Sequence, residues 1–557
     1  MITKRSLLLV VLILYSKITF AQQRSFDVCV YGSTPSGIAA SIQAARMGKR
    51  VVLLSTSSHV GGMMTAGLTA TDINNYQYVG GIAKEIFERL YIYYLNPKVW
   101  KYQTRSSFFT LNGNHSFGGK NDQSKMQWVY EPNVLENILK KMLKEANVKV
   151  AFNQIIKLKN GVSKNNNHIN FVLTNNDHVY SAKVYIDASY EGDLMARTGV
   201  SYNLGRESNK QFNETLNGRR PNEGTDNELK FVSPYILTNG HLSLLPYIEA
   251  YSSAPFGSAD KKVQAYGFRL TLTDVVANSR PIAKPTNYNS LWFEFLGRMF
   301  NVHPNLKLGK ILSITPMPNR KVDVNGLDFV GANYNYVEDS EQARLQLNIL
   351  HKDYALGMLW FLQNDIRVPQ SIRKEIKKWR LTRDEYQDSE NFPQQLYIRE
   401  GRRMQGEFIM REQNCDGSIP LKESIGVGTY KFDCHTVSRE LSKNGDLISE
   451  GRFYEPDKPY TISYKVLLPR IQQCDNLLVS SCISATHVAY STIRMEPVYL
   501  LLGQAAGTLA VIAINQKTAI QYVSYSSIKQ QLIKDKQILE PSQTILEKFV
   551  NFIKQIR

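Results

Sequence analysis

The apolar positions near the start of the chain form a short run, then a helical spacing, then a second run. Residues 27–31 are mostly β-formers, Ile38, Ile42 and Ala45 share one helix face, and residues 51–54 are Val-Val-Leu-Leu. A short, fully apolar run is typical of a parallel strand buried on both faces. The pattern therefore predicts a strand, a turn, a helix and a second strand.

Further along, the period changes from helical to alternating. Pro132 suits the first turn of a helix that we predict to run to about residue 146, and residues 148–152 predict a third parallel strand. Alternating runs separated by Asn- and Gly-rich turns then predict a β-meander. Its strands are expected at 154–159, 169–173 and 178–182. The meander leads into a parallel strand over 184–187.

The C-terminal region predicts one further strand and a long helix. Residues 476–481 predict a strand, and Pro497 opens an apolar helix. Small residues share one face of this helix, at Gly503, Ala506, Gly507 and Ala510. They allow close approach of another backbone or of a cofactor. A membrane-spanning helix is the alternative, and the polar Gln504 within it argues against that interpretation.

The first turn has the features of a dinucleotide-binding site. Gly32 permits a tight turn, Gly37 lets the helix lie close to the strand, and the free amides at the helix N-terminus can hold a pyrophosphate. Two positions depart from the G-x-G-x-x-G fingerprint: Thr34 replaces the middle glycine, and Ser55 stands where an acidic residue would bind the ribose.

A second glycine-rich segment follows the second strand. His59 to Gly67 reads HVGGMMTAG, with three glycines in seven residues. A loop of this composition directly after such a strand indicates backbone that approaches a ligand closely. We therefore expect cofactor contacts here, with an ordinary flexible connection as the alternative.

Length and composition fit an exported globular enzyme. With 557 residues and 43% hydrophobic content, two or three structural units are expected. Lys4 and Arg5, the apolar run 7–14 and a small residue at Ala21 predict a signal peptide over 1–21. The protein is then periplasmic or secreted, with no stable membrane span after cleavage; an uncleaved anchor is the alternative.

Charge and cysteines exclude some partners. The net charge is +18, and the predicted signal peptide contributes three of the basic residues. Lysines and arginines are scattered, so no nucleic-acid track is predicted, whereas acidic small molecules or anionic polysaccharide remain compatible, as does a merely solvated basic surface. The five cysteines lack zinc spacing, so we predict no metal, and their odd number argues against a disulfide framework.

Six segments carry a family resemblance, in order along most of the chain: 32–54, 59–72, 79–87, 185–208, 399–410 and 477–510. On these segments the chain resembles the secreted bacterial FAD-dependent oxidoreductases sometimes labelled xanthan lyase-like, a branch of the glutathione-reductase-type flavoproteins. Ser55 departs from the glutamate that the resemblance leads one to expect.

The resemblance implies an α/β fold with FAD as cofactor. A Rossmann-like FAD-binding domain, made of a parallel sheet and a β-meander, would comprise residues 26–205 and 460–515. An α+β substrate domain would be inserted at 206–459, and residues 516–557 would form a C-terminal helical tail.

The expected cofactor contacts come from both segments of that domain. The positive end of the helix that begins near Pro497 would stabilise negative charge at the N1 and C2 carbonyl side of a reduced flavin. The predicted cofactor-binding residues are Gly32, Ser33, Thr34, Pro35, Ser36, Gly37, Ser55, Gly61, Gly62, Met63, Thr65, Ala188, Asp193, Ser484, Met495, Glu496 and Pro497.

Three residues are the predicted catalytic candidates. His487, in an expected loop before the last helix, is favoured as the acid/base because a histidine pKa lies near neutrality. His435 and Arg402 are the others, the latter on an apparent helix with Arg399 and Arg403. Each has a structural alternative, as a hydrogen-bonded histidine or as part of an ion pair.

Three functions are compatible with these observations. The favoured one is an FAD-dependent oxidoreductase that transfers a hydride from a small organic substrate, such as a sugar or uronate, to flavin N5, with an unknown electron acceptor. The second is a non-redox polysaccharide-processing lyase or hydrolase with a structural or internally cycling dinucleotide. The third is a secreted binding protein on a degenerate nucleotide fold.

Overall fold

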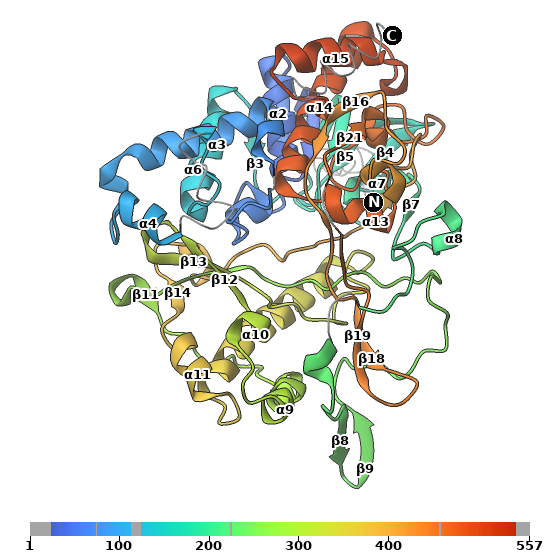
Figure 1. The fold of residues 1–557 in the computed structure, drawn as a ribbon. Coiled ribbons are helices and arrows are strands. Elements are labelled where there is room, and N and C mark those ends of the chain that lie inside the picture. Colours follow the sequence, from blue (N-terminus) through green and yellow to red (C-terminus); the bar gives the residue numbers. More distant parts are fainter. Residues whose placement is uncertain (1–23, 74, 113–123, 223–225, 456–457, 542–557) are drawn as a thin grey trace, which may run out of the picture.

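The computed structural model describes residues 24–73, 75–112, 124–222, 226–455 and 458–541 (Figure 1). The predicted signal peptide, residues 1–21, and the end of the predicted C-terminal tail lie outside these ranges.

A parallel sheet forms the centre of the first unit. Strands β3 (Lys149–Ala151), β2 (Val51–Leu54), β1 (Arg24–Tyr31) and β6 (Val179–Asp187) lie in this order. The C-terminal half of β6 also pairs with the distant β22 (Leu477–Val479), in parallel and with Leu477 opposite Tyr185. Every residue of β2 is buried, as its apolar run predicts. The predicted Rossmann-like α/β fold is therefore confirmed, and a late segment returns to its sheet.

The β-meander forms with one strand displaced. The predicted strand over 154–159 is wrong, since within it only Ile156 makes an isolated bridge. The chain turns at Asn160, which has φ 58°, and the outer strand begins later, as β4 (Val162–Asn165). It pairs with β5 (His168–Leu173), which pairs with the start of β6. The Asn-rich stretch at 165–167 forms the hairpin tip.

Two helices of small residues pack tightly beside this sheet. Helices α2 (Pro35–Arg46) and α14 (Glu496–Gln516) lie against each other (Figure 1). A Cβ on Gly503 would lie 2.0 Å from the Ser36 carbonyl oxygen, and one on Gly507 2.5 Å from that of Ala40. By length and composition α14 could cross a membrane, but 89% of its most apolar window is buried within the protein.

The inserted unit has its own antiparallel sheet, in the half of the molecule opposite α2 and α14 (Figure 1). The strand order is β11-β14-β10-β13-β12. These strands are β10 (Leu270–Thr273), β11 (Ser279–Arg280), β12 (Ser313–Met317), β13 (Lys321–Asn325) and β14 (Arg380–Thr382). The accompanying helices are α9 (Glu294–Val302), α10 (Glu341–Asn364) and α11 (Gln370–Ile376).

The remaining elements join or cover the two units. The helices are α3 (Gly81–Leu95), α4 (Arg105–Asn112), α6 (Pro132–Glu145), α7 (Asp193–Thr198), α8 (Asn209–Phe212), α12 (Glu412–Cys415), α13 (His487–Ile493) and α15 (Tyr525–Lys534). The strands are β7 (Tyr202–Asn203), β8 (Tyr235–Thr238), β9 (His241–Leu244), β15 (Arg403–Met404), β16 (Ser424–Gly428), β17 (Phe432–Cys434), β18 (Ser438–Leu441), β19 (Leu447–Glu450), β20 (Phe453–Glu455) and β21 (Tyr460–Ser463).

The segment after α14 packs back onto the first unit. Helix α15 lies against α14, and the Gln537 amide donates to the Leu501 carbonyl at 3.2 Å. The described part of the predicted tail thus covers the outer side of α14.

Candidate functional site

The turn between β1 and α2 requires glycine at both predicted positions. Gly32 has φ +101°, and a Cβ there would lie 2.7 Å from the Ser189 nitrogen. A Cβ on Gly37 would lie 1.9 Å from the Gly32 carbonyl oxygen. The strand and the helix can therefore approach this closely only without side chains at these positions.

Thr34 has a specific role at this turn. It caps α2: its hydroxyl accepts from the Gly37 amide at 3.3 Å and donates to the Ala188 carbonyl at 2.7 Å. Threonine at the middle glycine position thus joins the helix N-terminus to the end of β6. Pro35 occupies the first turn, and the buried Ser36 hydroxyl donates to the Ser480 carbonyl at 3.1 Å.

A pocket lies at the carboxyl ends of these strands. Four of the predicted cofactor residues line it: Gly32, Ser33, Thr34 and Gly62. Its other lining residues were not predicted; they are Thr56, Ser57, His59, Ser189, Tyr190, Glu191, Gln394 and Gln395. The hydroxyl residues after β2 were detectable from their position, whereas the two glutamines come from the inserted unit and carry no local signal.

Ser55 lies behind this pocket rather than on its wall. It is fully buried; its Oγ is 2.8 Å from the Ser33 Oγ and donates to the His59 carbonyl at 2.8 Å. Its hydroxyl therefore fixes the loop, while the next two residues, Thr56 and Ser57, face the pocket.

The glycine-rich loop meets Tyr190 and the start of α14. Gly61 has φ +110°, and a Cβ on Gly62 would lie 2.5 Å from the Tyr190 hydroxyl oxygen. That hydroxyl accepts from the Met63 amide at 3.1 Å and donates to Glu496 Oε1 at 3.2 Å. Residues from three distant segments thus converge at the helix end. Thr65 closes the loop by donating to the Val60 carbonyl at 2.8 Å.

The N-terminus of α14 presents a buried carboxyl group. Met495 is the N-cap residue, and Pro497 lies in the first turn. Burial raises the pKa of Glu496 to about 8, against the hydrogen bond from Tyr190, so this carboxyl is mainly protonated at neutral pH. Its Oε2 has no hydrogen-bond partner among the described residues. A buried donor at this helix end is therefore available to a ligand.

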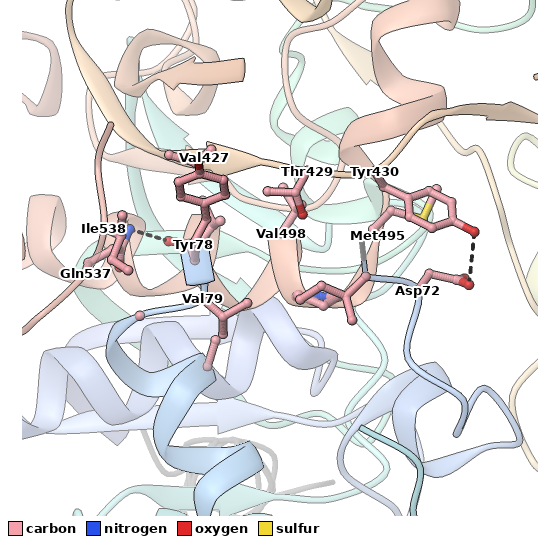
Figure 2. A pocket seen from close by; sticks show the side chains of 15 residues that line it. Asp72, Tyr78, Val79, Val427, Thr429, Tyr430, Met495, Val498, Gln537 and Ile538 are labelled. Carbon is pink, nitrogen blue, oxygen red and sulfur yellow. Dashed lines mark hydrogen bonds between the residues drawn. The ribbon is translucent and has the colours of Figure 1, made fainter. Parts of the chain in front are cut away.

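A second carboxylate lies beside the same helix end. Figure 2 shows Asp72 and Tyr430 pointing toward each other next to Met495, with 3.3 Å between the Tyr430 hydroxyl and Asp72 Oδ1. They border a cavity of about 20 Å³ that Val498 and other apolar side chains line. Burial raises the pKa of Asp72 to about 6, although Arg269 lowers it.

His435 follows β17 and is held by the half-buried Asp328, which also forms an ion pair with Arg399. Its Nδ1 lies 2.6 Å from Asp328 Oδ2, and Arg399 contacts the other oxygen of that carboxylate at 2.8 Å. Burial and the charge of Arg399 lower the pKa of His435, against the effect of Asp328. The imidazole is therefore neutral at pH 7, with Nδ1–H donating to Asp328. The His435 Nε2 is 4.0 Å from Asp433 Oδ1, beyond hydrogen-bond distance.

An arginine connects His435 to the start of α14. Arg494, the residue after α13, donates to the Asp433 carbonyl and to the Tyr397 hydroxyl, both at 2.8 Å. Asp433 directly precedes the Cys434–His435 step, and Arg494 directly precedes Met495. His435 and the N-terminus of α14 are thus held in one buried polar network.

His487 has a different environment. The predicted loop here is wrong, since His487 is the first residue of α13. The residue is fully buried, and its Nδ1 lies 2.9 Å from both carboxylate oxygens of Glu400, while Nε2 is 3.6 Å from Cys434 Sγ. Burial lowers the pKa of His487, but Glu400 outweighs that effect and raises it to about 10. The side chain is therefore a paired imidazolium at neutral pH.

The three neighbouring arginines lie outside any helix, so the predicted helix is wrong here. Arg403 begins β15 and pairs with Glu207 at 2.6 Å and with Glu400 at 2.9 Å. Arg402 pairs with Asp193 at 3.0 Å and with Glu338 at 2.9 Å.

Two of the predicted cofactor residues have protein partners. Asp193 accepts from Arg344 at 2.7 Å, and this pairing lowers its pKa to about 2 even though burial opposes the shift. The Ser484 hydroxyl accepts from the Gly406 amide at 3.0 Å. Both side chains hold distant segments together.

The cysteines and acidic groups form no obvious metal centre. All five cysteines are buried and free. Within the described ranges, no group of three or more His, Cys, Asp or Glu side chains is arranged to hold a metal ion.

The chain belongs to the FAD dependent oxidoreductase family, whose model matches residues 27–532. A comparison with curated proteins found no match.

Three solved structures are each similar to part of the chain. OxyS anhydrotetracycline hydroxylase from Streptomyces rimosus is 10% identical, with 33% of this chain and 36% of that chain covered and a TM-score of 0.22. The 3-ketosteroid-delta4-(5alpha)-dehydrogenase from Rhodococcus jostii RHA1 is 15% identical, with 32% and 50% covered and a TM-score of 0.20. L-proline dehydrogenase from P. horikoshii is 13% identical, with 33% and 59% covered and a TM-score of 0.22. The matched part is less than two thirds of each of these chains.

The residues on both sides of the strand ends fit FAD, the cofactor of this family. The open amides and glycines at the start of α2 suit the pyrophosphate, and the hydroxyls of Thr56 and Ser57 suit the ribose. The unpaired Glu496 carboxyl suits a polar edge of the flavin ring. Gly32, Gly62 and Tyr190 line the same pocket, and the Tyr190 hydroxyl connects it to Glu496.

Proposed function

We propose that this FAD-dependent oxidoreductase oxidises a hydroxyl group of a small organic substrate, a sugar or uronate, with His435 as the catalytic base. The observation that carries the proposal is the half-buried Asp328–His435 pair at 2.6 Å, linked through Asp433 and Arg494 to the α14 N-terminus. A histidine held in this way has one nitrogen committed and the other free to accept a proton.

His435 and its partners handle the proton. The substrate hydroxyl donates its proton to Nε2 as its carbon–hydrogen bond is broken and the carbon–oxygen double bond forms. When bound, FAD would supply the two-electron acceptor for the hydride that leaves this carbon. Asp328 stabilises the resulting imidazolium. Although burial opposes it, Arg399 lowers the pKa of Asp328 well below its usual range and keeps it ionised throughout.

His487 is better suited to positioning than to proton transfer. Its imidazolium lies between Glu400 and Cys434 and has no exposed surface. Glu400 and Arg403 share that network, which borders the residues leading to His435. We therefore propose that His487 holds the segments around the site in place, and that His435 accepts the proton.

The proposal also includes a cellular location and a class of partner. The basic, apolar and small-residue pattern of residues 1–21 supports export to the periplasm or the medium. The scattered basic residues support a small-molecule or carbohydrate partner rather than nucleic acid. The acceptor that reoxidises the flavin is left open.

The decisive experiment is anaerobic mixing of the flavin-loaded protein with a panel of sugars and uronates. Loss of flavin absorbance with at least one compound is the expected result. A rise in unsaturated-uronate absorbance without flavin bleaching would identify a lyase. Folded protein that takes up no FAD would overturn the redox function altogether.

A further inference from the structure

A large cleft opens beside His435, on the side of the inserted unit. It has a volume of about 640 Å³, within the ~300–1,000 Å³ range typical of small-ligand pockets. Asp328 and Thr436 are among its lining residues, so the partner of His435 and the residue after His435 both face it. The other walls come from α9, α10 and the β18–β19 hairpin, which lie in the half of the molecule opposite α2 (Figure 1).

Aromatic rings line one side of this cleft. Phe293, Phe295, Tyr354 and Tyr454 all contribute, and Phe293 and Tyr354 pack with ring centroids 5.3 Å apart. Flat aromatic surfaces of this kind suit the apolar face of a sugar ring, while the phenol hydroxyls can meet its hydroxyl groups.

Two arginines add positive charge to the same cleft. Arg439 stacks over the Phe295 ring at 4.5 Å, and Arg452 over the Tyr454 ring at 4.7 Å. Among the described residues, no carboxylate lies within 4.0 Å of either guanidinium. The buried Arg206, Arg269 and Arg399, by contrast, all have acidic partners.

The two arginines are thus oriented by rings and by hydrogen bonds to the Tyr354 and Tyr454 hydroxyls, while neither guanidinium is paired with a carboxylate of the described residues. Arginine recognises carboxylates through paired, charge-assisted hydrogen bonds. The Coulomb attraction of two guanidinium groups would favour a carboxylate over a neutral group of the same shape.

We propose that this cleft is the substrate site and that Arg439 and Arg452 select a carboxylate-bearing sugar, a uronate. The inference rests on the proposed function, because it gives that reaction its substrate class. The sugar ring lies against the aromatic side, the carboxylate binds the arginines, and the hydroxyl to be oxidised is directed toward His435.

The test compares binding of matched sugars to the flavin-loaded protein under anaerobic conditions. D-glucuronate and D-galacturonate are titrated calorimetrically against D-glucose and D-galactose, which lack the carboxylate. We expect a uronate to bind, and R439Q or R452Q to weaken that binding about tenfold or more, as the loss of a charge-assisted hydrogen bond predicts. Binding of the neutral sugar should be unchanged by either substitution.

Two further variants make the result specific. R439K retains the charge and should recover part of the uronate affinity. R280Q removes the same charge from an exposed arginine outside the cleft and should leave affinity as in the wild type. Circular dichroism and Tm values verify that each variant is folded.

The outcomes distinguish a failure of the cleft proposal from a failure of the proposed oxidation. Uronate binding that is insensitive to both arginines, or no uronate binding at all, would overturn the cleft proposal even if neutral sugars bleach the flavin. Arginine-dependent binding without bleaching by any compound would retain the cleft and refute the proposed oxidation.

Discussion

At the scale of single residues, His435 is the group on which the proposed chemistry depends. In H435N the proton acceptor is lost, so we expect flavin reduction by substrate to slow by about 10²–10⁴-fold while FAD stays bound. His435 can accept a proton only in its neutral form, and burial and Arg399 lower its pKa. The rate of flavin reduction in the wild type should therefore decrease only at pH values below the ordinary histidine pKa. Anaerobic stopped-flow measurements across pH test both points. Unchanged reduction in H435N would exclude this residue as the base.

For His487 we predict an effect on stability rather than on the rate of flavin reduction. Its pKa is about 10 in the folded protein, above the unfolded value, so the stability from its Glu400 pair is present below about pH 6.5 and is lost as pH rises through about 10. H487Q leaves Glu400 buried beside Arg403 without its histidine partner, and should cost about 3–5 kcal/mol of unfolding free energy at neutral pH. Chemical denaturation measures this loss. A shifted pH profile of flavin reduction in folded H487Q would instead indicate a catalytic role.

Individual residues also show how far sequence reasoning reaches. Gly32 and Gly37 were identifiable because only glycine satisfies the turn, and Thr34 was recognisable as a departure. The distinction between His435 and His487 was not accessible, because their pKa values depend on Asp328 and Glu400, which lie far away in sequence.

At the scale of elements, the contact between α2 and α14 supports the cofactor end of the site. A Cβ at Gly503 would lie 2.0 Å from the Ser36 carbonyl oxygen, so G503A must push the helices apart. We expect a loss of at least about 1–3 kcal/mol of stability, as for other overpacked sites. FAD affinity should fall as well, since Ser36 lies in the first turn of α2.

Thermal unfolding and FAD titration measure these two effects. G309A is a suitable comparison, because no atom lies within 4 Å of its added Cβ and no positive φ is required there. Its stability should change by no more than about 0.5 kcal/mol. Equal stability of G503A and G309A would contradict the close helix contact.

Elements with a strong local period were predictable, and those fixed by distant partners were not. Strand β2 and helix α14 follow directly from their apolar patterns. The spacing of Arg399, Arg402 and Arg403 resembles a helix face, but the segment is not helical, and each guanidinium is buried against a different distant carboxylate. Likewise, Asn160 ends the predicted strand at 154–159 through a turn that only its backbone conformation reveals.

At the scale of the whole molecule, the pocket at the strand ends is shared between the two units. The first unit supplies Gly32 and His59, whereas the inserted unit supplies Gln394 and Gln395. This shared wall was not predictable from local sequence patterns, since it arises only when the insertion folds back over the parallel sheet. Cofactor binding and the docking of the insertion should therefore be coupled.

His59 links the units and makes that coupling dependent on pH. Its Nδ1 lies 3.1 Å from Glu136 on α6, and its Nε2 3.0 Å from Asp388 in the insertion. The hydrogen bond with Glu136 raises the pKa of His59, against burial, and Asp388 adds to the increase. The stability that the protonated His59 bridge contributes is therefore fully present below about pH 6.5. It is lost as pH rises through the pKa of His59 in the folded protein, which is higher than in the unfolded chain. FAD should dissociate faster at alkaline than at mildly acidic pH.

D388N removes one end of the bridge and tests this expectation. Because Asp388 is 57% exposed, its pair is screened, and the change in unfolding free energy should be only about 0.2–1 kcal/mol. The variant should nevertheless release FAD faster at about pH 6, where wild-type His59 is protonated, and match the wild type at high pH. Stopped-flow dilution, following the change in flavin fluorescence, measures the release rate. A D388N effect that is equal at both pH values would show that the histidine charge does not hold the insertion over the cofactor.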